Sequence, residues 1–62
     1  MTNEEVDAAI LAHLRASGRA KFHDIRFGVG RGSDYRQIDR RIQALRRAGK
    51  IDFDTTLGWG LR

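Results

Sequence analysis

The 62-residue chain contains neither cysteine nor proline. Without cysteine it has no disulfide framework and no thiolate metal site. Its longest apolar run is far shorter than the roughly 18 residues that a membrane-spanning helix needs. Its first residues, MTNEEVDAA, are acidic and lack the basic start of a signal peptide. We therefore expect a small protein of the cytoplasm, associated with the nucleoid in a prokaryote or phage, and no membrane partner.

Catalytic, cofactor and metal motifs are also lacking. The two histidines, His13 and His23, have no obvious third ligand at the spacing that a metal site requires. The glycines at alternate positions of residues 28–32 match neither a dinucleotide fingerprint nor a P-loop. No serine–histidine–acid or cysteine nucleophile pattern is present. The sequence predicts no enzyme activity, no metal and no cofactor.

Positive charge, by contrast, is concentrated in the middle of the chain. The net charge is +4, from 12 Lys and Arg against 8 Asp and Glu. Residues 31–50 carry six arginines and one lysine against two aspartates, which sum to +5. A basic segment of this kind is the electrostatic signature of a protein that binds a polyanion. Arginine presents a planar fork that matches phosphate and guanine edges.

This basic segment has apolar residues at helical spacing. Three of them recur at i, i+4 and i+7, namely Ile38, Ile42 and Leu45. The opposite face is almost wholly arginine and glutamine, and is centred on Arg36, Arg40, Gln43 and Arg47. We expect a helix over about residues 34–48, whose polar face contacts the partner.

The flanks of this helix favour helix termini. The glycines between residues 28 and 32 predict a turn before it, because glycine adopts positive φ at little cost. Ser33 or Asp34 can cap its start by accepting a backbone N–H. Gly49 can end it in the left-handed conformation.

Two shorter amphipathic segments precede the basic one. Thr2 and Glu5 form a capping box ahead of a helix expected over about residues 3–17. A two-turn helix is expected over about residues 21–28, after a brief extended piece near Ala20. The apolar residues that predict the two helices are Val6, Ile10, Leu14, Phe22, Ile25 and Val29.

The last residues change to a period of two. Apolar residues alternate first with aspartates and then with glycines, which predicts a hairpin over about residues 50–62 with one buried face. These apolar residues are Ile51, Phe53, Leu57, Trp59 and Leu61. The turn is expected at residues 54–56. Trp59 is expected to close the core rather than to stack on a base.

This order of elements resembles the winged-helix family of DNA-binding domains. The segments FHDIRFGVG, YRQIDRRIQALRRAGKI and IDFDTTLGWGLR carry the resemblance. It implies a mainly α fold with a small β-hairpin, a three-helix winged helix-turn-helix over residues 1–62. The third helix would be the recognition helix in the DNA major groove. The resemblance implies these exposed positions on it: Arg36, Gln37, Arg40, Gln43 and Arg47. The hairpin tip carries two aspartates and no basic residue, so we expect it to be mainly structural.

The expected function is sequence-preferring binding of double-stranded DNA, as in a small transcriptional regulator or a phage or plasmid accessory factor. Additional contacts with phosphate are expected from Lys21, Arg31, Ser33, Tyr35, Arg41 and Arg46. One small module covers little DNA, so a dimer on DNA is expected. The alternative is a protein-interaction module whose arginine-rich helix docks on an acidic protein. RNA binding is a third, weaker option.

Overall fold

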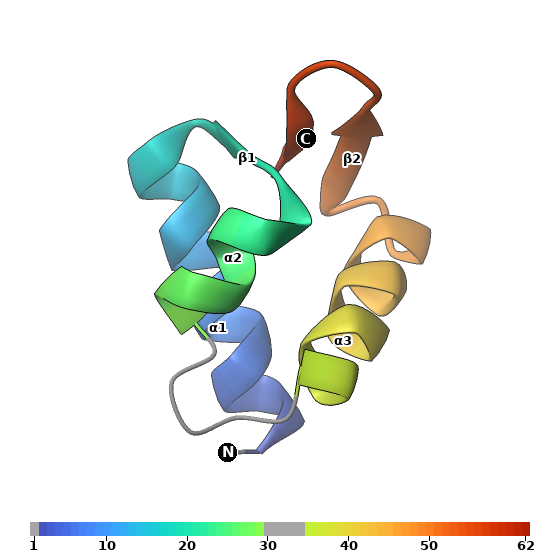
Figure 1. Cartoon of the computed structure of the whole chain (residues 1–62). Helices are drawn as coiled ribbons and strands as arrows, with labels where there is room; N and C mark the ends of the chain where they lie inside the picture. The colour runs from blue at the N-terminus through green and yellow to red at the C-terminus, as the bar shows by residue number, and fades with distance from the viewer. Residues whose placement is uncertain (1, 30–34) are drawn as a thin grey trace.

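Three helices and a small antiparallel sheet make up the computed structural model, which describes residues 2–29 and 35–62 (Figure 1). The elements are α1 (Asn3–Ser17), β1 (Arg19–Ala20), α2 (Phe22–Val29), α3 (Tyr35–Arg47), β2 (Ile51–Asp54) and β3 (Gly58–Leu61). The predicted fold class, mainly α with a small hairpin, is confirmed. The arrangement is compatible with a winged-helix-like topology.

The sheet joins the C-terminal hairpin to the segment between α1 and α2. Its strand order is β1-β3-β2, and both pairings are antiparallel. Ala20 lies opposite Trp59 in one pairing, and Phe53 lies opposite Trp59 in the other. The short β1, between α1 and α2, thereby fixes the C-terminal hairpin against the N-terminal half of the molecule.

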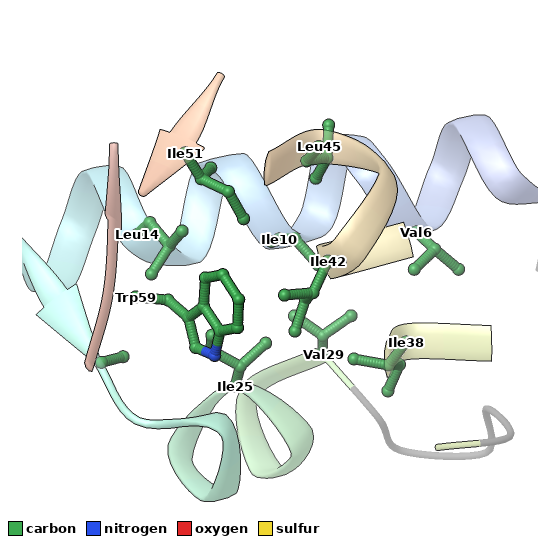
Figure 2. Packing of buried hydrophobic residues seen from close by; sticks show 11 residues of the cluster. Val6, Ile10, Leu14, Ile25, Val29, Ile38, Ile42, Leu45, Ile51 and Trp59 are labelled. Carbon is green, nitrogen blue, oxygen red and sulfur yellow. The ribbon is translucent and has the colours of Figure 1, made fainter. Parts of the chain in front are cut away.

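Apolar residues from all six elements form the core. The buried core residues are Val6, Ile10, Leu14, Ala20, Ile25, Val29, Ile38, Ile42, Leu45, Ile51 and Trp59. Figure 2 shows their side chains pointing toward a common centre, with the indole of Trp59 among them. The helical periodicity therefore predicted the buried faces of the helices correctly, and Trp59 closes the core as expected.

The start of α1 and the end of α3 follow the predicted chemistry. The Thr2 hydroxyl accepts the Glu5 backbone N–H at 3.1 Å, and the Glu5 carboxylate accepts the Thr2 N–H at 3.0 Å. The bond from the Thr2 backbone N–H has the largest effect on the pKa of Glu5 and lowers it, and the Thr2 side chain lowers it further. Gly18 and Gly49 follow the two helices with φ of 82° and 76°, the left-handed region that glycine adopts most easily.

The first two residues of the turn predicted for residues 28–32 lie inside α2 instead, and the first of them, Gly28, does not have a positive φ. Its small size instead permits helix packing. A Cβ at this position would lie 2.4 Å from His13 Nδ1, so a glycine lets α1 and α2 approach each other. The rest of the predicted turn and the caps Ser33 and Asp34 lie outside the described residues.

The hairpin does not have the single buried face that its alternation predicted. Ile51 and Trp59 are buried, but Phe53, Leu57 and Leu61 are 46%, 57% and 38% exposed. Leu57 belongs to the β2–β3 turn, where strand alternation does not apply. This turn lies at the end of the molecule away from the N terminus (Figure 1).

The two glycines of β3 are buried for a reason that the alternation does not reveal. A Cβ on Gly58 would lie 2.7 Å from the Ala20 carbonyl oxygen, and one on Gly60 would lie 2.8 Å from Arg19 Cγ. Gly58 and Gly60 therefore leave room for β1 to approach.

Candidate nucleic-acid interface

Helix α3 exposes three arginines on the side opposite its buried residues. Arg36, Arg40 and Arg47 are exposed, whereas Ile38, Ile42 and Leu45 are buried. The arginines are separated by four and seven residues, so they lie on one side of the helix. We call these three residues the arginine face. Gln43, the remaining predicted member of this face, is half-buried.

The next side of α3 faces α1 instead of solvent. Arg41 forms a two-pronged ion pair with Asp7, in which Nε donates to Oδ1 at 2.7 Å and Nη2 donates to Oδ2 at 2.8 Å. This pairing raises the pKa of Arg41. Gln37 Nε2 donates to Asn3 Oδ1 at 3.1 Å. The structure therefore places Arg41 and Gln37 as links between two helices, away from the arginine face.

A cavity of about 250 Å³ lies between α2 and the first turns of α3. It is lined by Phe22, Tyr35, Arg36, Asp39 and Arg40. The cavity brings two members of the arginine face together with two aromatic rings and one carboxylate. Tyr35 is 51% exposed, so its phenol is accessible beside the arginines.

A further cation lies beside Tyr35. The guanidinium carbon of Arg26, on α2, is 4.9 Å from the centre of the Tyr35 ring, within cation–π distance. Arg26 is exposed and extends the positive surface from α3 onto α2. Sequence reasoning missed Arg26 as a site residue, because no spacing rule relates a position on one helix to the start of the next.

The remaining predicted contacts are placed as follows. Lys21 is exposed just before α2. Arg46 is exposed, and its guanidinium carbon lies 5.8 Å from the centre of the Trp59 ring. Arg31 and Ser33 lie outside the described residues. The structure thus brings Arg36, Arg40 and Tyr35 together and separates them from Arg41.

The hairpin aspartates have partners within the molecule. Asp52 Oδ1 lies 2.9 Å from Arg19 Nη2. Asp54 Oδ1 accepts the backbone N–H groups of Leu57 and Thr56, which lower the pKa of Asp54. Asp52 therefore carries a nearby compensating charge, and Asp54 closes the turn in which it lies.

Over residues 2–29 and 35–62, no three His, Asp or Glu side chains gather where they could hold a metal ion. None of the helices that the structure describes is long and apolar enough to cross a membrane.

Comparison of the chain with protein-family models, curated proteins and solved structures found no match. The function is therefore argued from the geometry of α3 and its surroundings.

Proposed function

We propose that this protein binds double-stranded DNA as a winged-helix protein, with α3 lying in the major groove. The observation that carries the proposal is the arginine face. With 13 residues, α3 is about 20 Å long, and a helix with its side chains fits the roughly 12 Å width of the major groove. The opposite side of α3 is buried in the core, so the arginine face is the side that is presented outward.

The charges around α3 support a phosphate-rich partner. Arg26 on α2 is exposed beside Tyr35 of α3, and Lys21 is exposed just before α2. Arginine and lysine bound to phosphate release counterions from DNA, which supplies a salt-dependent binding free energy. We assign Lys21, Arg26 and Arg47 to the phosphates, and Arg36 and Arg40 to the groove floor. Tyr35, beside Arg26, is placed to donate a hydrogen bond to phosphate.

The biological role that fits is binding without catalysis, as in a small regulator of transcription or an accessory factor of a phage or plasmid. The rival function is docking on an acidic protein. An acidic hairpin tip, which phosphate would repel, is the feature that favours this rival over DNA. Because Asp52 is paired with Arg19 and Asp54 closes its own turn, these aspartates have structural roles. The acidic tip therefore does not favour the rival over DNA.

The first test replaces Arg40 and Arg47 together by alanine. Fluorescence anisotropy of a labelled random duplex, titrated at several salt concentrations, gives the slope of log K against log salt. Each lost phosphate contact reduces the slope by about 1. Since Arg47 is assigned to phosphate and Arg40 to the groove floor, the double variant should bind more weakly, with a slope lower by about 1.

The matched control is Arg15→Ala, which removes an exposed arginine in the last turn of α1. It should leave most of the affinity intact. Wild-type protein that fails to bind any duplex at low salt would refute the proposal. An equal loss of binding free energy per charge removed in the control and in the double variant would show that net charge, rather than α3, governs binding.

A further inference from the structure

Asp39 is an anomaly on a surface proposed to contact phosphate. It is exposed on α3, directly before Arg40 and three residues after Arg36, and it lines the same cavity as both. No hydrogen bond or ion pair joins its carboxylate to another side chain within residues 2–29 and 35–62. A carboxylate here repels phosphate, so binding to the DNA backbone does not explain its position.

We propose that Asp39 is a specificity-determining residue that accepts a hydrogen bond from the N4 amino group of a cytosine in the major groove. The inference rests on the proposed function and deepens it by naming the class of DNA site. That class is a duplex in which one cytosine adjoins guanines that are read by the neighbouring arginines.

Each base presents its own set of hydrogen-bond donors and acceptors in the major groove. An ionised carboxylate only accepts hydrogen bonds, and guanine and thymine present only acceptors there, so both would be repelled. Adenine presents an amino group beside the N7 acceptor, a pattern that an amide matches better than a carboxylate does. Cytosine presents its amino group without an acceptor beside it, and carboxylates pair with this group.

The neighbours of Asp39 favour guanine at adjacent positions. Arg36 lies three residues before Asp39 and four before Arg40, so it neighbours both on the helix surface, and all three line one cavity. We therefore expect them to approach neighbouring base pairs. A guanidinium binds guanine O6 and N7 with two hydrogen bonds. Asp39 is exposed and lines the cavity together with Phe22 and Tyr35, so it is accessible from the side on which DNA would lie.

The test is a binding selection from a pool of random duplexes, made with wild type, Asp39→Asn and Asp39→Ala. Wild type should enrich cytosine at one position of the selected site. Asp39→Asn should shift that position toward adenine, and Asp39→Ala should lose the preference there alone. Changing this one base pair should weaken wild-type binding about ten-fold, and should hardly affect Asp39→Ala.

Asp24→Asn on α2 is the matched control, since it removes another exposed aspartate. It should raise affinity for all duplexes slightly and leave the selected site unchanged. Circular dichroism would verify that each variant is folded.

Three results would overturn the inference, and they are distinguishable. Asp39 variants that select the wild-type site would show that this residue does not read a base. Wild type that binds duplex without any base preference would refute base readout while the proposed DNA binding stands. Wild type that binds no duplex would refute both.

Discussion

At Gly58, both the backbone conformation and the packing exclude a side chain. Its φ is 90°, and an added Cβ would lie 2.7 Å from the Ala20 carbonyl oxygen, which belongs to the backbone and cannot rotate away. Gly58→Ala should therefore destabilise the fold by about 2–4 kcal/mol, from left-handed strain plus overpacking. Urea unfolding followed by the fluorescence of Trp59 would measure the loss.

Gly18→Ala separates the two causes. Gly18 has a similar φ of 82°, but nothing lies within 4 Å of an added Cβ. Gly18→Ala should therefore lower the free energy of unfolding by about 1–2 kcal/mol, from left-handed backbone strain alone. If the two variants lost equal stability, the close approach of β1 to Gly58 would not be a packing constraint.

Contacts between residues far apart in the sequence could not be predicted from it. That Arg41 lies on α3 followed from the helical period, but its pairing with Asp7 did not, because the partners are 34 positions apart. The same holds for Arg26 beside Tyr35. Both contacts depend on how the helices pack, which local spacing does not encode.

The helices themselves could be predicted closely. The expected ranges 3–17, 21–28 and 34–48 became α1 at Asn3–Ser17, α2 at Phe22–Val29 and α3 at Tyr35–Arg47. Periodicity and end-capping residues act over a few positions, so the sequence displays them directly.

The hairpin was predicted less well, although its strands and turn were expected. Exposure on a strand depends on what lies against each face. Phe53 and Leu61 pair with Trp59 and Ile51 across the hairpin, yet only Trp59 and Ile51 are buried. The pairing of β1 with β3 is another long-range contact that alternation alone cannot specify. The arginine face was predictable because it lies on the side of the helix opposite the apolar residues, whose spacing predicted that they are buried.

Two carboxylates make the stability of the protein depend on pH. Glu5 closes the capping box of α1, and Asp54 closes the β2–β3 turn, each with a lowered pKa. A lowered folded-state pKa adds stability that is present above the unfolded pKa, about 4.3 for Glu and 3.9 for Asp. This stability is lost as pH falls through the folded pKa. The protein should therefore become less stable on acidification below about pH 4.5.

The variant Glu5→Gln with Asp54→Asn tests this assignment. Both new side chains keep a hydrogen-bond acceptor but do not titrate. The change in urea midpoint between pH 6 and pH 3 should be smaller than in wild type, although other carboxylates such as Asp7 still contribute. An unchanged pH dependence would assign the acid sensitivity to other groups.

For the molecule as a whole, the sheet is part of the core that holds α3 in place. Ile51 of β2 and Trp59 of β3 are buried together with residues of all three helices. Trp59 also contacts Phe53 on the neighbouring strand, with ring centres 4.9 Å apart. Because β1 pairs with β3, a disrupted hairpin would also leave β1, the strand between α1 and α2, without its partner. The orientation of the arginine face therefore depends on residues that need not touch a partner.

Trp59→Ala tests this dependence. Trp59 is only 6% exposed, and truncating a buried Trp costs about 3–5 kcal/mol. Since stabilities of about 0.05–0.15 kcal/mol per residue are typical, this loss is comparable with the whole stability of a chain of 62 residues. Circular dichroism should show a largely unfolded protein at 25 °C, whereas Trp59→Phe should remain folded with a lower urea midpoint and retain duplex binding. Wild-type helicity and stability in Trp59→Ala would instead show that the three helices fold without the sheet, and that the hairpin does not orient α3.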